Sequence, residues 1–138
     1  MMETNTLTVS LQALHLLCAV LWFGSLIYTE LILWPRMRRA GLLAAVQGEL
    51  RSVTVRKMMA VSIIGTIVLG FARGAAGGVF DHITTPYGIM FVLAALVGTS
   101  MMVWWLCFPT RDRVWSWRLY YSGFWVLFAL MLGMRFTA

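Results

Sequence analysis

Charged residues are scarce in this chain of 138 residues, and their scarcity excludes an ordinary soluble domain. They make up 12% of the sequence, whereas hydrophobic residues make up 61%. Soluble domains carry about twice that share of charge. The mean hydropathy is +0.83, and the apolar residues fall in blocks. The composition therefore predicts a polytopic membrane protein that forms a single compact domain over residues 1–138.

The sequence also lacks the motifs of common soluble enzymes. It contains no glycine-rich phosphate loop, no nucleophile elbow and no Cys-x-x-Cys pair. Its two cysteines, Cys18 and Cys107, fall in apolar segments near opposite ends of the expected spans, so we expect no disulfide between them. No small-residue cleavage site follows a short apolar core at the N-terminus, and we expect the first apolar segment to be retained.

Four apolar segments are long enough to cross a bilayer, since about 20 residues suffice for a helix. We predict spans at residues 7–34, 53–75, 86–108 and 118–136. Pro35 is expected to end the first helix, because proline has no amide hydrogen and restricts its predecessor. Residues 40–50 fit either a short interfacial helix or a solvated connector. The predicted fold is an all-α, antiparallel bundle of four transmembrane helices.

Basic residues are distributed unevenly between the expected loops. Nine of the eleven lie in or beside the first and third loops: Arg36, Arg38, Arg39, Arg51, Arg56, Lys57, Arg111, Arg113 and Arg118. Only Arg73 and Arg135 lie on the other side. Because cytoplasmic loops are enriched in Lys and Arg, both termini are predicted outside the cytoplasm of a bacterial inner membrane. The net charge of +6 is thus attributed to topology and lipid headgroups, not to nucleic acid.

One histidine lies inside an apolar span. His15 is expected about two turns below the outer end of the first span, where an imidazole usually faces other helices and pairs or binds a ligand. Steps of three and four residues place on one helix face His15, Cys18, Trp22, Ser25 or Leu26, and Thr29. This face is predicted to point inward.

Three interpretations of His15 stay open on these residues. It is a structural residue that hydrogen-bonds a neighbouring helix, an axial ligand of heme b, or a ligand of copper or another metal together with Cys18. For heme, Arg73 and Arg135 lie at the right depth to hold the propionates. The candidates for the second axial ligand are Met90, Met131, Met134 and His82, and an open position is the alternative.

Two stretches resemble a known membrane family. The segment LHLLCAVLWFGSLIYTELILWPRM is similar to the first span of the CopD-like superfamily, through His15, Trp22–Phe23–Gly24 and Pro35–Arg36. The segment TTPYGIMFVLAALVGTSMMVW is similar to its third span, which often opens with Thr-x-Tyr-Gly. The resemblance covers residues 12–105. The superfamily includes bacterial copper-resistance membrane proteins and HemJ-type protoporphyrinogen oxidases.

The HemJ-type resemblance implies heme b bound through the histidine of the first span, here His15. It also implies a lysine in the third span, where this chain has Ile89, Met90 and Phe91 and no lysine. Protoporphyrinogen oxidation is therefore not expected. The CopD-type resemblance implies copper import, for which further histidines or methionines are expected, and this chain has ten methionines.

The leading hypothesis is a small b-heme membrane protein that serves electron transfer or another redox reaction, with His15 as axial ligand. One alternative is a copper-handling or transport protein that uses His15, Cys18 and methionines. Another is a structural subunit of a larger membrane complex. The expected partners are the lipid bilayer and a redox partner or complex, and small residues such as Gly70 and Gly74 suit a homodimer.

Overall fold

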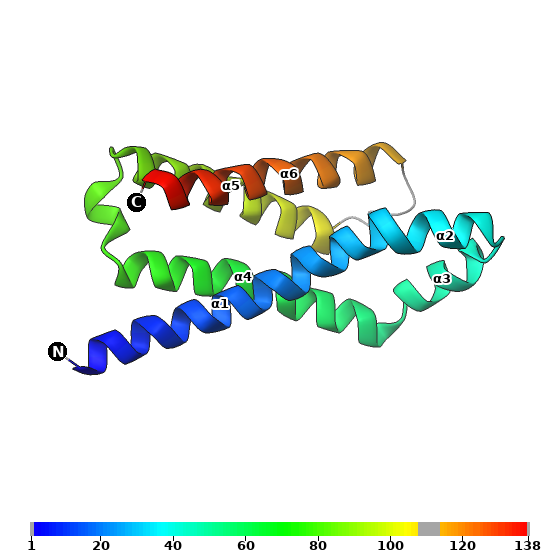
Figure 1. Ribbon diagram of the computed structural model, residues 1–138, viewed down its shortest axis with the longest axis horizontal. Helices are drawn as coiled ribbons and strands as arrows, with labels where there is room; N and C mark the ends of the chain where they lie inside the picture. Colours follow the sequence, from blue (N-terminus) through cyan, green and yellow to red (C-terminus); the bar gives the residue numbers. More distant parts are fainter. Residues whose placement is uncertain (1, 108–113, 138) are drawn as a thin grey trace. The chain divides into compact units, whose positions relative to one another are not determined.

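The computed structural model describes residues 2–107 and 114–137, and every regular element in them is helical. The six α-helices are α1 (Met2–Tyr28), α2 (Trp34–Arg39), α3 (Leu43–Leu50), α4 (Val53–Ala76), α5 (Pro86–Cys107) and α6 (Val114–Thr137) (Figure 1). A π-helical turn at Thr29–Leu33 joins α1 to α2, and a 3₁₀ turn at Val79–His82 precedes α5. The predicted all-α fold class is confirmed.

Four of these helical stretches are long and apolar enough to cross a membrane. They are Thr6–Arg39, Val53–Ala76, Pro86–Cys107 and Arg118–Phe136. Three of the four predicted spans agree with them to within a residue at each end. The chain is therefore a multi-pass membrane protein by the length and composition of its helices. Phe108, Arg111 and Arg113, which entered the sequence predictions, lie outside the described residues.

The prediction that Pro35 ends the first helix is wrong. The helix continues through Pro35 to Arg39, because a π-helical turn precedes the proline, with only Trp34 between them. In this turn the backbone N–H of Trp34 donates to the carbonyl oxygen of Thr29, five residues back. The wider turn shifts the preceding carbonyl groups away from the proline ring. They then neither clash with the ring nor need a hydrogen bond from its nitrogen, which carries no hydrogen. Proline thus shifts the register of this helix without stopping it.

The chain divides into two compact units. The first unit consists of residues 13–66, and the second consists of residues 1–12 and 67–138. The division passes through α1 and α4, so that each of these helices contributes to both units. The first unit thus holds α1 from residue 13 onward, all of α2 and α3, and α4 up to residue 66. The second unit holds the rest of α4 together with α5 and α6.

Within the first unit, α1 packs against the beginning of α4. Trp22 of α1 and Ile63 of α4 are fully buried. Cys18 and Gly65 meet so closely that a Cβ atom at position 65 would lie 2.7 Å from the Cys18 sulfur. Small residues allow transmembrane helices to approach in this way, since association in lipid depends on packing.

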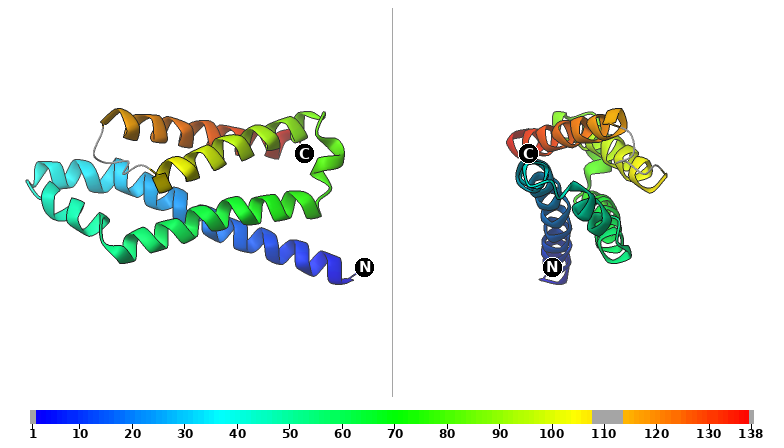
Figure 2. Two further views of the ribbon diagram at one scale, coloured as in Figure 1. Left: turned by 180° about the vertical axis from the view of Figure 1, so that it is seen from behind. Right: turned by 90° about the vertical axis from the view of Figure 1, so that its right-hand side faces the viewer.

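Within the second unit, α5 and α6 run antiparallel along their length (Figures 1 and 2). Thr85 caps the start of α5: its hydroxyl accepts a hydrogen bond from the Gly88 amide at 3.1 Å and donates to the His82 carbonyl at 2.7 Å. Pro86 occupies the first turn of α5, as its sequence position predicts. The end of α4 contacts α5 through Gly74, where a Cβ atom would overlap the ring of Phe91.

Candidate functional site

His15 forms a hydrogen bond to the neighbouring helix of the first unit. Its Nδ1 atom lies 2.9 Å from the backbone carbonyl oxygen of Thr66, which is 51 residues further along the chain. The His15 side chain is half-buried. The contact joins α1 to α4 at the level where the sequence placed the candidate site.

The hydrogen bond assigns the two nitrogens of the His15 ring. A carbonyl oxygen can only accept, so Nδ1 carries the hydrogen and donates it to Thr66. In the neutral ring, Nε2 is then the atom with the lone pair. Histidines that bind metals have this arrangement in most cases, because a hydrogen bond from the other ring nitrogen fixes tautomer and orientation.

Two hydroxyl groups on α4 continue a polar stripe from the His15 contact. The Thr66 hydroxyl donates to the Ser62 carbonyl at 2.7 Å, and the Ser62 hydroxyl donates to the Met58 carbonyl at 2.8 Å. Ser62 and Thr66 are both buried, at 3% and 4% exposure. Each hydroxyl therefore donates its hydrogen bond within α4, and the Thr66 carbonyl accepts a hydrogen bond from the His15 imidazole.

Sequence reasoning missed Ser62 and Thr66. The signal that would find them is their spacing of four residues in an otherwise apolar span, which places both hydroxyls on one helix face. Such a pair of small polar residues suits a contact between transmembrane helices.

The predicted inward face of the first span is confirmed. Trp22 is 0% exposed and Leu26 is 3% exposed, while His15, Cys18 and Thr29 are half-buried. Ala19, four residues after His15, is also buried, and its small side chain permits the close approach of α1 and α4. The steps of three and four residues predicted this face, because residues at that spacing lie on one side of a helix.

Cys18 lies one turn beyond His15, as the copper interpretation requires. Its thiol is free and half-buried, and it packs onto Gly65. Within residues 2–107 and 114–137, no group of three or more His, Cys, Asp and Glu side chains is placed to hold a metal ion. A copper site on His15 and Cys18 would therefore depend on thioether or backbone donors.

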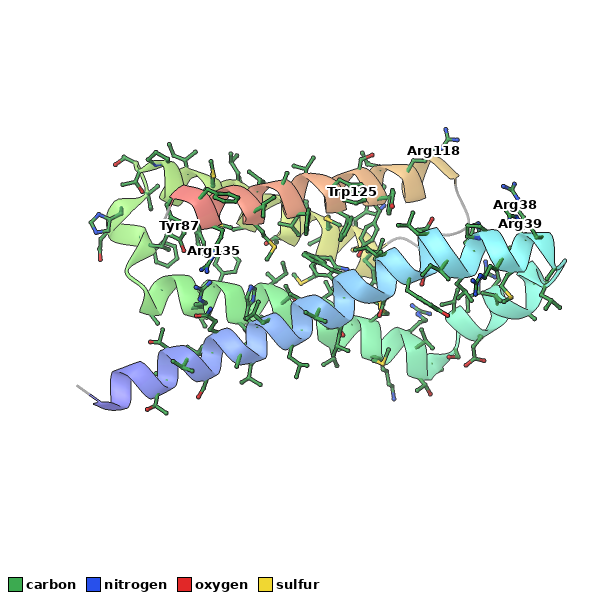
Figure 3. The ribbon with its side chains drawn as sticks, in the orientation of Figure 1. Arg38, Arg39, Tyr87, Arg118, Trp125 and Arg135 are labelled. Carbon is green, nitrogen blue, oxygen red and sulfur yellow. The ribbon has the colours of Figure 1, made fainter. Side chains whose placement is uncertain are left out.

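The other predicted site residues belong to the second unit. Arg73 is half-buried in the last turn of α4. Arg135 is exposed in the last turn of α6 (Figure 3). Met131 and Met134 of α6 are half-buried. Met90 of α5 packs onto α6, where a Cβ atom at Gly133 would lie 3.0 Å from its sulfur. The structure thus groups the arginines and methionines in one unit, and His15 with Cys18 in the other.

Basic side chains in the last turn of a helix also have a local role. The C-terminal end of a helix carries a partial negative charge from its carbonyl groups, and a cation there stabilises it. Arg73 and Arg135 both meet this condition. Their positions are consistent with holding an anionic group and are equally what helix electrostatics alone would favour.

Comparison of the chain with protein-family models, with curated proteins and with solved structures found no match. The resemblance to the CopD-like superfamily therefore stays a prediction from the residues that carry it. The structure supports the coarser statement that the chain has the four long apolar helices of a four-span membrane protein.

Proposed function

We propose that this chain is a small integral membrane protein that binds heme b, with Nε2 of His15 as an axial ligand, and that it serves electron transfer or another redox reaction. The observation that carries the proposal is the hydrogen bond from Nδ1 of His15 to the Thr66 carbonyl at 2.9 Å. In axial histidines, the ring nitrogen that does not bind the iron usually donates such a hydrogen bond. The bond therefore leaves Nε2 as the nitrogen that would face the iron.

The residues of the chain divide the work in this proposal. His15 binds the iron, and the Thr66 carbonyl holds the imidazole in one orientation and raises its basicity. The sequence prediction assigns Arg73 and Arg135 to the propionates and Met90, Met131 or Met134 to a second ligand, and these roles would apply only with heme bound. The bound heme supplies one-electron transfer.

The proposal includes the finer predictions from the sequence. The four helices form one antiparallel bundle in a bacterial inner membrane, with both termini outside the cytoplasm. The chain is a distant member of the CopD-like superfamily. Protoporphyrinogen oxidation is not expected of it, because α5 has no lysine where the resemblance implies one.

The test is the absorption spectrum of the full chain, purified from cells supplied with a heme precursor. We expect a Soret band, about one heme per chain by the pyridine hemochromogen assay, and loss of both in His15→Ala. Cys18→Ala is the matched control, since it alters the same helix face one turn away and should keep the band. A Soret band that survives in His15→Ala, or a colourless wild-type protein, contradicts the proposal.

The same hydrogen bond favours a second candidate function, in which His15 only joins two helices of a structural subunit. Hydrogen bonds between transmembrane helices contribute about 0.6 kcal/mol on average. This candidate predicts a colourless, metal-free protein that co-purifies with other chains, and a His15→Ala variant less stable by roughly that amount. A colourless protein that contains copper in proportion to the chain, and loses it in Cys18→Ala, would instead support copper handling.

A further inference from the structure

The segment between the first two spans carries a dense group of cations. Residues 36–57 contain six basic side chains, all exposed: Arg36, Arg38, Arg39, Arg51, Arg56 and Lys57. The only acidic residue in this segment is Glu49. We call this group the basic elbow. Arg38 and Arg39 extend away from the ribbon at the end of α2 (Figure 3).

The basic elbow is folded, with a helix between its two groups of cations. After α2, Gly41 adopts a positive φ of 71°, and the chain turns back into α3, which leads to the start of α4 (Figures 1 and 2). At a rise of about 1.5 Å per residue, the eight residues of α3 span about 12 Å. Three arginines precede this helix and three basic residues follow it.

The helix α3 has the surface of an interfacial helix. Leu43, Val46 and Leu50 recur at steps of three and four residues and share one face, yet no residue of α3 is buried. Leu42, directly before the helix, is 52% exposed. A short helix with an incompletely covered apolar face and flanking cations is suited to the boundary between headgroups and acyl chains.

Helix electrostatics explain four of these six cations. Arg36, Arg38 and Arg39 lie in the last turn of α2, and Arg51 is the C-cap residue of α3, positions where the helix dipole favours positive charge. Arg56 and Lys57 follow the start of α4, where the dipole does not stabilise a cation. The dipoles of their own helices therefore do not account for these two cations.

We propose that the basic elbow binds the phosphate groups of anionic phospholipids, with α3 seated at the level of the headgroups. The argument is charge complementarity together with the incompletely covered apolar face of α3. The lipid supplies an anion to the cations at the start of α4, and its acyl chains cover Leu42 and the exposed part of the apolar face of α3. This goes beyond the enrichment of cytoplasmic loops in positive charge, which requires no lasting contact with a lipid.

The test is lipid binding to the full chain in a neutral detergent, with native mass spectrometry as the readout. We expect the protein to retain added phosphatidylglycerol and not phosphatidylcholine, with an affinity that falls as salt is raised. Each basic residue near an anionic surface contributes about fivefold in affinity, so the triple variant Arg36→Gln, Arg38→Gln, Arg39→Gln should lose more than about tenfold. The double variant Arg56→Gln, Lys57→Gln tests the other end of α3 and should also weaken binding.

Two controls separate lipid binding from other effects. Arg118→Gln removes one exposed arginine of α6 outside the basic elbow and should weaken phosphatidylglycerol binding less than Arg38→Gln, which should weaken it about fivefold. Replacing the three arginines of α2 by lysine keeps their charge and should keep the preference. Equal retention of both lipids by the wild-type chain overturns the proposal, and so does loss of binding in the lysine variant. Because binding is measured in detergent, an altered orientation in the membrane cannot produce the result.

Discussion

The two units of this chain hold their helices together in different ways. In the first unit, α1 meets α4 through polar and small residues: His15 bonds to Thr66, and Cys18 packs onto Gly65. In the second unit, bulky apolar side chains make the contacts. The rings of Phe91 and Phe71 pack edge-on with their centroids 6.2 Å apart, and Met90 packs onto Gly133. The first unit therefore has a polar contact between its helices, whereas these contacts of the second unit are apolar.

This difference supports the proposal that a cofactor is held at His15. In lipid, burial of apolar groups gives little advantage, so close packing and hydrogen bonds decide stability. A scaffold reaches this with shape alone, as α5 and α6 do where Met90 packs onto Gly133. Polar groups in a span cost energy unless they are paired, so their concentration at His15, Ser62 and Thr66 is the less expected feature and the better indication of a site.

We expect the largest loss of stability from a substitution at Gly88, in the second unit. A Cβ atom there would overlap the carbonyl oxygen of His82 and the backbone of Ile83, and neither can move without disturbing the cap of α5. We expect Gly88→Ala to lower the free energy of unfolding by about 3 kcal/mol. The measurement is unfolding by dodecyl sulfate in mixed micelles, followed by circular dichroism.

The control for Gly88 is Gly24 of α1, where a Cβ atom would meet nothing within 4 Å. Gly24→Ala should be neutral, or stabilising by up to about 1 kcal/mol, because alanine is the better helix former. Equal destabilisation by the two changes would show that the contact with the His82 carbonyl is not what requires glycine at position 88.

The packing of the first unit should break less severely, at Gly65. A Cβ atom at this position would lie 2.7 Å from the sulfur of Cys18, which is the end of a side chain that can rotate. We expect Gly65→Ala to cost about 1 kcal/mol in the same assay. Cys18→Ala should restore most of this loss when the two changes are combined, since it removes the atom that clashes. Additive effects in this double-mutant cycle would contradict direct contact between α1 and α4 at this point.

The sequence predicted the spans well and the contacts poorly, for physical reasons. A run of about 20 apolar residues is needed to cross a bilayer, so span positions are readable from composition alone. The helical period likewise identified the face of Trp22 and Leu26, which is buried. The partners of each helix are a different matter, because they depend on which faces meet. Met90 was a candidate ligand in the sequence, and nothing there indicated that its sulfur packs onto Gly133.

The candidate site was predicted in part. His15 was singled out because an imidazole in an apolar span is costly. Its acceptor is a backbone carbonyl, which every residue possesses, so the spacing of Ser62 and Thr66 could indicate the contact face of α4 but not which carbonyl accepts the hydrogen bond. Pro35 shows a second limit: proline prohibits a regular α-helical turn, but it does not prohibit a helix that widens by one residue just before it.

The smallest effect on stability is expected at Pro35. Within a regular helix a proline costs about 3 kcal/mol, but the π-helical turn at Thr29–Leu33 has already removed the clash and the missing hydrogen bond. Pro35→Ala should therefore change the free energy of unfolding by less than about 1 kcal/mol. The substitution should instead change the conformation of the turn, because the amide hydrogen of alanine allows the α-helical hydrogen-bond pattern to form there.

That return would rotate the end of the helix relative to its beginning. Removing the extra residue of the turn shifts the register by one residue, or about 100° around the helix axis. Spin labels at Val20 and Arg38, both exposed, in a background with Cys18 and Cys107 replaced by alanine, would report the rotation as a new distance by pulsed electron paramagnetic resonance. An unchanged distance would mean that packing within the first unit, and not the proline, maintains the π-helical turn. The orientation of the α2 arginines relative to His15 would then be set by tertiary contacts.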